Sequence, residues 1–345
     1  MDESENGRMT FPSEEEHHGT GRMDEHDDEH GEGTVAKRPR VEDEEAQELE
    51  HLIEFRRFWD ENMKPHYGPV DATTAGMGPM RYTDSGPPRF GGICYNALEI
   101  LSLRVTELKE GLEWPIRVYG IVAVRDSMDH RRNLLFDRSE ENCQILTAKD
   151  SSLLLIGPSR AIALIDPPEF EIELRVLGSM PSDKKILSAV YFEYGSNRYR
   201  TAHAGLVMTR TLASKRSTME LKYCHLTTPL EATIEIWHTE GSIDFNGRFF
   251  AYMEYMGEDD IVLLDFRDHK VTLKYDGQVL LSRRVVLVEE GKELILGVKA
   301  WKNGDVDSAV EKRVAFPSRF HSKSDGSFDV GFCRMSIIVA WSVLC

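Results

Sequence analysis

The residues that could support covalent catalysis are scattered along the chain and match no catalytic motif. A nucleophilic Ser or Cys needs a neighbouring His that a carboxylate orients. The chain has no Gly-x-Ser-x-Gly turn, and Cys143, Cys224 and Cys333 fall in predicted strands, where small buried thiols are common. It also lacks the Walker and Gly-x-Gly-x-x-Gly patterns that bind phosphates. The sequence therefore predicts no catalytic residue and no cofactor-binding residue.

Side chains that could bind a metal are equally dispersed. The five cysteines show no Cys-x-x-Cys spacing, so neither a zinc knuckle nor a disulfide framework can be recognised. Four histidines near the start of the chain are irregularly spaced and have no cysteine near them. Further candidates lie far apart in the sequence: His203, His225, His238, His269 and His321. We therefore expect no metal site.

Two other groups of residues have types that suit ligand chemistry. Glu171 and Glu173 alternate with Ile172 and Leu174 in a predicted strand, which assigns both carboxylates to a solvent-facing side of a sheet. That position suits surface solubility better than glycoside chemistry. A set of aromatic residues could form a stacking platform for a carbohydrate or a nucleotide: Phe249, Phe250, Tyr252, Tyr255 and Trp301. Because aromatic strand residues are mostly buried, we expect this set to belong to the core.

Strands must position all of these candidates. Between residues 93 and 345, short apolar or alternating runs are separated by turn residues, and no stretch of ten or more residues has a helical period. Residues 152–177 show this pattern of short runs and turn residues most clearly. Asp276-Gly277, between Val271–Tyr275 and Gln278–Val285, predicts a two-residue hairpin with a type I′ turn. We predict a mainly β fold, a large antiparallel sandwich or two packed sheets, preceded by a disordered acidic tail and one amphipathic helix.

The negative charge of the chain is concentrated at its N-terminus. Residues 1–50 contain 18 Asp and Glu against 5 Lys and Arg, whereas the rest of the chain contains 41 against 37. Residues 1–40 have almost no apolar side chains, so we expect them to stay disordered. Their basic cluster, Lys37, Arg38 and Arg40, predicts a nuclear import signal that an import receptor would bind through charge complementarity. The alternative is a solvated run of charges.

Residues 41–63 have the period of an amphipathic helix. Acidic residues fill its first turns, and no Gly or Pro interrupts it before Pro65. Its predicted partner face consists of five apolar side chains: Leu49, Leu52, Ile53, Phe55 and Trp59. This face could dock on the β-domain of the same chain, which is the commoner arrangement, or bind a partner protein. Residues 64–92, rich in Gly and Pro, are predicted to be a linker between the helix and the β-domain.

Charge and hydropathy also limit the partners and the compartment. The nearly balanced body has no sustained basic stripe, which argues against nucleic-acid binding. The start of the chain lacks the profile of a secretory signal, and the most apolar late run, Ser336–Leu344, is too short to span a membrane. We therefore predict a protein of the nucleus or the cytoplasm that is not secreted and has no membrane segment. The oligomeric state stays open.

Two longer stretches carry a family resemblance. They read EILSLRVTELKEGLEWPIRVYGIVAVRD and NCQILTAKDSSLLLIGPSRAIALIDPPEFEIELRV. The markers are Trp114-Pro115, Tyr119-Gly120, Val124-Arg125-Asp126, Gly157-Pro158-x-Arg160 and Asp166-Pro167. Over residues 97–344 the chain resembles a family of uncharacterised cereal-grass proteins that share a domain of unknown function. A similar module follows a ribosome-inactivating domain in a jasmonate-induced cereal protein, so the resemblance implies a stress or defence context and no active site.

One short motif matches a motif of ribosome-inactivating N-glycosidases, the enzymes to which the resemblance points. Ribosome-inactivating N-glycosidases have a Glu-x-x-Arg motif on a helix, and this chain has Glu54 and Arg57 at that spacing. An ion pair three residues apart on an exposed helix face explains the spacing equally well and contributes only about 0.2–0.5 kcal/mol. The large α+β body that would precede such a helix is also missing.

From the sequence we therefore predict a non-enzymatic binding or adaptor module, with a stress or defence context implied by the resemblance. An enzyme related to rRNA N-glycosidases is one alternative. A structural domain that assembles through its helix is the other.

Overall fold

The computed structural model describes residues 41–74, 78–86, 95–178, 184–195, 205–253, 257, 260–302 and 304–344. The predicted disordered tail 1–40 lies outside the described residues, and so does the predicted import signal at Lys37, Arg38 and Arg40. Among the described helices, none is both long enough and apolar enough to cross a membrane.

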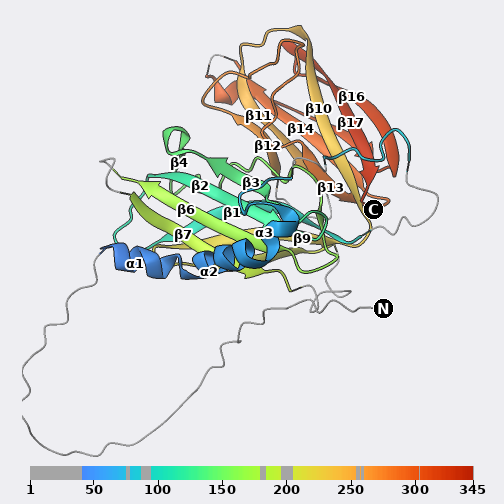
Figure 1. The fold of residues 1–345 in the computed structure, drawn as a ribbon. Coiled ribbons are helices and arrows are strands. Elements are labelled where there is room, and N and C mark those ends of the chain that lie inside the picture. Colours follow the sequence, from blue (N-terminus) through green and yellow to red (C-terminus); the bar gives the residue numbers. More distant parts are fainter. Residues whose placement is uncertain are drawn as a thin grey trace, which may run out of the picture. The chain divides into compact units, whose positions relative to one another are not determined.

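The described chain after residue 95 consists mainly of β-strands (Figure 1). They are β1 (Ala97–Leu108), β2 (Ile116–Arg125), β3 (Asn133–Arg138), β4 (Gln144–Leu146), β5 (Ile162–Ala163), β6 (Glu169–Leu177), β7 (Lys184–Glu193), β8 (Val207–Ala213), β9 (Ser217–Leu226), β10 (Pro229–Gly241), β11 (Asn246–Tyr252), β12 (Ile261–Phe266), β13 (Val285–Glu289), β14 (Glu293–Trp301), β15 (Val310–Pro317), β16 (His321–Asp329) and β17 (Cys333–Val343). Two short 3-10 turns, Glu140–Asn142 and Val306–Ser308, accompany them.

The strands form four antiparallel sheets. The N-terminal sandwich combines the sheet β5-β1-β9-β8 with the sheet β3-β2-β6-β7, to which β4 is added through β2. The C-terminal sandwich combines the sheet β13-β10-β17-β16 with the sheet β12-β11-β14-β15. The prediction of a mainly β, antiparallel fold is confirmed, and the strands divide between two sandwiches.

Each sandwich has its own apolar core. In the N-terminal sandwich, Leu103 of β1 and Val122 of β2 belong to one buried cluster. In the C-terminal sandwich, Ile234 of β10 and Leu296 of β14 belong to a second. This second cluster continues into Leu101 of β1, so the two sandwiches also share apolar contacts.

Strand β6 shows where alternation predicted the structure and where it failed. Ile172 and Leu174 are buried in the core, as predicted. The prediction that Glu171 and Glu173 both face solvent is wrong for Glu171, whose side chain is only 1% exposed, whereas that of Glu173 is 20% exposed. The reason is that a helical segment covers the outer side of this sheet.

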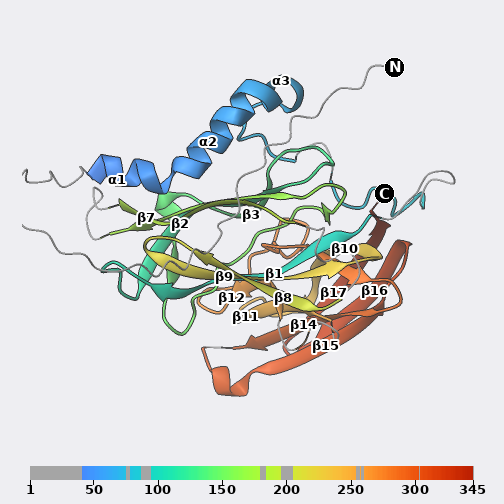
Figure 2. The ribbon, with the colours of Figure 1, turned by 90° about the horizontal axis from the view of Figure 1, so that it is seen from below.

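That helical segment comprises α1 (Val41–Glu48), α2 (Glu50–Phe58), a π-helical turn (Trp59–Met63) and α3 (Lys64–Tyr67). It lies along the sheet that contains β2, β6 and β7 (Figure 2). In the π-helical turn the Lys64 N–H donates to the Trp59 carbonyl five residues earlier. Pro65, which has no N–H, then occupies the first turn of α3, where no amide donor is needed. The chain therefore stays helical one turn beyond the predicted end.

The described parts of the Gly- and Pro-rich stretch 64–92 contact the sandwiches. The Met80 N–H donates to the buried Glu231 carboxylate at 3.0 Å, and the Tyr82 N–H donates to Ser342 Oγ at 3.0 Å. These bonds hold residues 78–86 against β10 and β17.

The hairpin at Asp276-Gly277 is present, but its turn differs from the predicted type I′. A type I′ turn needs a positive φ at both central residues, and of these two only Gly277 has one, at +85°. The Lys274 N–H donates to the Gln278 carbonyl at 2.8 Å, and the Gly277 N–H donates to the Lys274 carbonyl at 3.0 Å. The loop therefore has three residues, with the glycine in the left-handed conformation that follows a tight turn.

The aromatic set of β11 is mostly buried, as its strand position predicted. Phe249 packs in the C-terminal core. Phe250 points to the other face, where its ring lies against Gly297 of β14 and under the guanidinium of Arg313. Trp301 is buried, Tyr252 is half-buried, and Tyr255 lies outside the described residues. The described members therefore offer no open stacking platform.

Candidate functional site

A cavity of about 540 Å³ lies between the helical segment and the outer face of β2 and β6. We call it the helix pocket. Its lining residues are Arg56, Asp60, Pro69, Val70, Asp71, Tyr119, Gly120, Ile121, Arg132, Glu173 and Arg175. Its three arginines come from α2, from the end of the β2–β3 loop and from β6, so only the folded chain brings them together.

The buried carboxylate of Glu171 organises this pocket. Arg56 donates to Glu171 Oε1 through Nε at 3.1 Å and Nη2 at 2.6 Å, and Arg132 donates to both carboxylate oxygens at 2.9 and 2.7 Å. Arg125 adds a contact of 3.3 Å. Burial by itself would raise the pKa of Glu171, but the hydrogen bonds and charges of these arginines, Arg132 first, hold that pKa below its ordinary value. Glu171 therefore stays ionised and fixes three guanidinium groups.

Arg125 lies beneath the helical segment and is itself only 1% exposed. Its guanidinium carbon is 4.4 Å from the centre of the Trp59 ring and 5.6 Å from that of Phe55. Its Nη2 donates to the Val70 carbonyl, and its Nη1 donates to the His130 carbonyl at 3.2 Å. A cation over an aromatic face is stabilised more strongly where water is excluded. Arg125 therefore joins the helix to the sheet through both charge and ring contacts.

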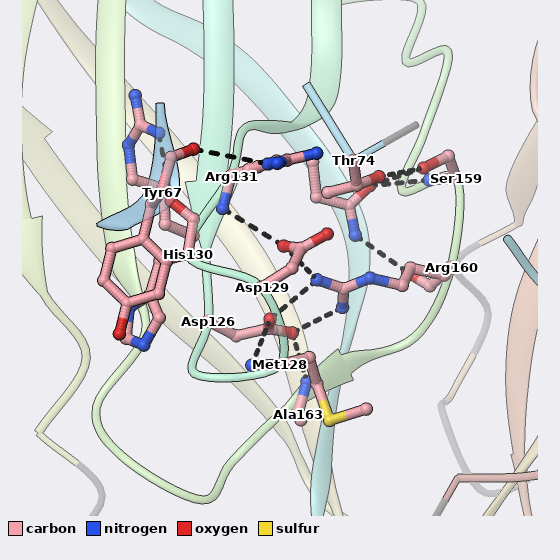
Figure 3. A network of polar contacts seen from close by, with 12 residues as sticks. Tyr67, Thr74, Asp126, Met128, Asp129, His130, Arg131, Ser159, Arg160 and Ala163 are labelled. Atoms are coloured by element: carbon pink, nitrogen blue, oxygen red, sulfur yellow. Dashed lines mark hydrogen bonds and ion pairs between the residues drawn. The ribbon is translucent and has the colours of Figure 1, made fainter. Parts of the chain in front are cut away.

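A second network fixes the β2–β3 loop that carries Arg132 (Figure 3). Arg160 donates to both oxygens of Asp126 at 2.7 Å and to Asp129 at 3.0 Å. Asp126 also accepts the Ala163 N–H at 2.8 Å. Because Asp126 and Arg160 are almost fully buried, this bidentate pair holds the loop in one conformation. The loop in turn presents Arg132 to Glu171.

The chain that follows α3 is bonded to the same loop. Arg132 donates its N–H to the Ala72 carbonyl at 2.9 Å, and its own carbonyl accepts the Thr74 N–H at 3.1 Å. The Tyr67 ring lies beside the His130 ring (Figure 3), and the two ring centres are 4.3 Å apart. Backbone hydrogen bonds, arginine side chains that donate to backbone carbonyls and a ring contact thus hold residues 64–74 on the N-terminal sandwich.

The predicted partner face of the helix is covered by the chain's own sheet. Three of its five residues are buried: Leu52, Phe55 and Trp59. The Phe55 ring stacks on Tyr191 of β7 at 4.4 Å. Leu49 is half-buried, and Ile53 is 49% exposed. Of the two arrangements that the sequence left open, docking on the β-domain of the same chain is the one that the structure contains.

The Glu-x-x-Arg motif of the helix does not contribute to the helix pocket. Glu54 lies 3.9 Å from His51, and Arg57 is exposed. Arg56, the residue between them, is the one that enters the ion-pair network. The motif therefore occupies the outer side of the helix.

The histidines and cysteines that the structure describes do not assemble into a metal site. The described residues include no group of three or more His, Cys, Asp or Glu side chains arranged to bind a metal. His225 is buried, His238 contacts the Gly241 carbonyl at 3.0 Å, and His203 lies outside the described residues. Burial raises the pKa of the Cys224 thiol to about 12 and that of the Cys333 thiol to about 11. Both thiols are therefore protonated at neutral pH and poor nucleophiles.

Sequence reasoning missed the central residues of the pocket. Arg125, Asp126 and Arg160 stood among the markers of the family resemblance, but nothing in their spacing showed that they meet. Arg132 lay in a loop without a motif, and Glu171 was assigned to solvent. To find these residues, one would have to know both the register of the strands and the place where the helix docks on them.

Comparison with known proteins gives one family match. A model described as "Domain of unknown function (DUF6598)" matches residues 97–339. No curated protein matches the chain. Similar solved structures include one of Extended-Synaptotagmin 2 that contains its SMP domain, with 9% identity, 73% of this chain and 58% of that chain covered, and a TM-score of 0.26. A human GIVD cytosolic phospholipase A2 bound to methyl gamma-linolenyl fluorophosphonate has 9% identity, covers 73% of this chain and 33% of that chain, and has a TM-score of 0.24. The chain thus spans less than two thirds of either, and neither likeness bears on function.

We predict that Glu171→Gln strongly destabilises the protein. It leaves three guanidinium groups without their buried counter-charge, and removing one partner of a buried ion pair costs about 3–5 kcal/mol. Urea denaturation should show a loss of that size in the free energy of unfolding. Glu173→Gln is the matched control, because Glu173 is 20% exposed and its replacement should cost less than about 1 kcal/mol. Equal losses in the two variants would contradict the central role of Glu171.

A second carboxylate of β6, that of Glu169, has a raised pKa, whereas the pKa of Glu171 is lowered. Glu169 of β6 lies opposite Glu193 of β7 and accepts a hydrogen bond from Tyr191. Burial, followed by the charge of Glu193 and then that of Glu171, raises the pKa of Glu169 to about 7, against the opposing effects of Arg125 and Tyr191. A carboxyl whose pKa rises on folding stabilises the protein below its ordinary pKa, and this stability is lost as the pH rises through the folded value.

Glu169→Gln should therefore stabilise the protein at pH 8. Glutamine cannot ionise and keeps an acceptor for Tyr191, so the variant avoids a buried charge that the wild-type protein must carry at that pH. We expect a gain of about 1–3 kcal/mol at pH 8 that shrinks toward zero as the pH falls to 5. Thermal unfolding of both proteins across this range measures it, and a difference that does not change with pH would refute the assignment.

Proposed function

We propose that this chain, which belongs to the DUF6598 family, is a non-enzymatic binding module that takes an anionic group of a small ligand into the helix pocket. One observation carries the proposal: Arg56 and Arg132 line the pocket while both are anchored on the same buried carboxylate. The ligand class is a phosphate, a sulfate or a carboxylate, because each has several oxygens that accept hydrogen bonds from guanidinium N–H groups.

The two arginines keep donors available for such a ligand. Arg56 uses Nε and Nη2 toward Glu171 and Glu173, and Arg132 uses Nε and Nη2 toward Glu171. The Nη1 group of each has no hydrogen-bond partner in the part of the chain that the structure describes. Because the anchored side of each guanidinium fixes its plane, little side-chain entropy remains to be lost on binding.

The charges around the helix pocket balance, so an anion would bind through the guanidinium donors that have no partner among the described residues. Four guanidinium groups meet three carboxylates around the pocket: those of Arg56, Arg125, Arg132 and Arg175 against those of Glu45, Glu171 and Glu173. Asp60, which lines the pocket, is paired with Lys64. Asp71 also lines it, so that five carboxylates balance five cationic groups. Its removal should therefore strengthen anion binding.

The composition of the lining supports binding over catalysis. The lining residues include no Ser, Cys, His or Lys, and two of their three carboxylates, Asp60 and Glu173, are held in ion pairs. The alternative of an enzyme related to rRNA N-glycosidases would use Glu54 and Arg57, and neither lines the pocket. The alternative of assembly through the helix would require Leu52, Phe55 and Trp59 to leave their buried positions. A plant stress or defence context, implied by the resemblance to cereal-grass proteins, belongs to the same proposal.

Calorimetric titration of the full chain with inorganic phosphate and with pyrophosphate tests the anion site. We expect saturable binding that weakens with added salt, and a loss of about 10- to 100-fold in Arg56→Gln, which removes a charged hydrogen-bond donor. Asp71→Asn should bind more tightly. Arg57→Gln, on the exposed side of the same helix, is the matched control and should bind as the wild type does. Wild-type affinity in Arg56→Gln, or no saturable binding of either anion, would overturn the proposal.

We also propose that the basic cluster of the tail directs the protein to the nucleus. Residues 1–45 fused to a fluorescent reporter should concentrate it in nuclei, and replacing Lys37, Arg38 and Arg40 with Ala should abolish that concentration. The same tail contains Arg8 and Arg22, whose replacement with Ala is the matched control and should change nothing. An unchanged distribution after the triple replacement would remove this proposal.

A further inference from the structure

A second cavity, of about 320 Å³, lies where the two sandwiches meet, and we call it the junction cleft. The N-terminal sandwich contributes side chains of β1, β9 and the segment 150–155, and the C-terminal sandwich contributes β11, β12 and two arginines that follow β12. Its polar lining residues are Ser102, Arg104, Asp150, Ser152, Lys222, Arg248, Asp260, Asp265, Arg267 and Arg283. It shares no residue with the helix pocket.

Ion pairs between the sandwiches hold the walls of the junction cleft together. Arg267 Nη2 of the C-terminal sandwich donates to the Asp150 carboxylate of the N-terminal one at 2.6 Å. Arg283, only 1% exposed, donates to the Ile100 carbonyl at 2.7 Å and pairs with the buried Glu99 of β1. Because both contacts cross the junction, the cleft exists before any ligand arrives, and ligand sites are often found at such domain boundaries.

Each arginine that lines the junction cleft is paired with a carboxylate. Arg104 pairs with Glu220 at 2.8 Å. Arg248 pairs with Asp260, and Arg267 pairs with Asp265 at 2.6 Å. A fixed anion would have to compete with carboxylates that already occupy these guanidinium groups. The ion pairs therefore leave little net positive charge in the cleft to attract an anionic ligand.

What the junction cleft does offer is a mixture of unused donors and acceptors. The Nη1 and Nη2 groups of Arg104 and the Nη1 group of Arg267 have no hydrogen-bond partner among the described residues, and neither do the hydroxyls of Ser102 and Ser152. The same holds for Oδ1 of Asp260. A hydroxyl group both donates and accepts, so a ligand with several hydroxyls can satisfy this mixture without bringing a charge.

Apolar side chains complete the lining of the junction cleft: Leu101, Leu153, Leu154, Leu155 and Val262. They suit the C–H faces of a sugar ring. A volume of about 320 Å³ is at the lower end of ligand pockets, which measure roughly 300–1,000 Å³, and so fits a small ligand. We propose that the junction cleft binds a neutral mono- or disaccharide through paired arginine and aspartate side chains. This site is independent of the anion site proposed above.

Saturation-transfer NMR followed by calorimetry on the full chain tests this proposal with a fixed panel of glucose, galactose, mannose, xylose, maltose and cellobiose. At least one sugar should bind saturably, and Arg104→Ala should weaken that binding by about 10-fold or more, as expected for the loss of a charged donor. Arg313→Ala is the matched control. Arg313 pairs with Glu311 and is 49% exposed, much as Arg104 is 47% exposed, but it lies outside the cleft, so affinity should stay within about twofold.

Two further measurements make the outcome decisive. Inorganic phosphate should not compete with the sugar, and Arg56→Gln should bind the sugar as the wild type does, because Arg56 lines only the helix pocket. Competition by phosphate, equal affinity of Arg104→Ala and the wild type, or failure of all six sugars to bind the folded protein would each overturn the saccharide site. None of these results depends on whether the helix pocket binds an anion.

Discussion

The ionised side chain of Glu171 is the contact on which the N-terminal half of the structure depends. It accepts hydrogen bonds from arginines of the helix, of β2 and of the β2–β3 loop, and it is almost fully buried. A buried guanidinium such as that of Arg125 is tolerated only if a counter-charge and hydrogen bonds replace water. Glu171 supplies both. The helix docks where it does because Arg56 completes this arrangement while Phe55 and Trp59 cover the apolar part of the same surface.

The helix is therefore packed on its own chain and lines the helix pocket. Its apolar residues pack inward on β7, and Arg56 forms one wall of the helix pocket. The second cavity is built by a different principle. At the junction of the sandwiches each arginine has its own carboxylate, so polarity is high and net charge is low. Both arrangements leave guanidinium N–H groups without a partner among the described residues; we propose an anionic ligand for the first cavity and a neutral polar ligand for the second.

Much of the fold could be predicted from local patterns, and the failures have physical causes. Alternation along β6 correctly assigned Ile172 and Leu174 to the core, because one side of a strand pair must be buried. The same pattern gave the wrong surroundings for Glu171, since alternation shows which side a residue faces and does not show what covers that side. The turn at Asp276-Gly277 was placed correctly but given the wrong type, because the same dipeptide fits loops of two and of three residues.

The candidate sites were harder to predict from the sequence than the fold was. The sequence by itself determined the strand-rich body, the amphipathic period of the helix and the lack of a catalytic motif, because these depend on neighbours within a few residues. Only the tertiary structure decided that the strands divide into two sandwiches and that Arg56, Arg132 and Glu171 meet. In the chain, Arg56 is 115 residues from Glu171, and Arg132 is 39 residues from it. Contacts over such separations are selected by the balance of burial and charge in the complete fold, and no local pattern records that balance.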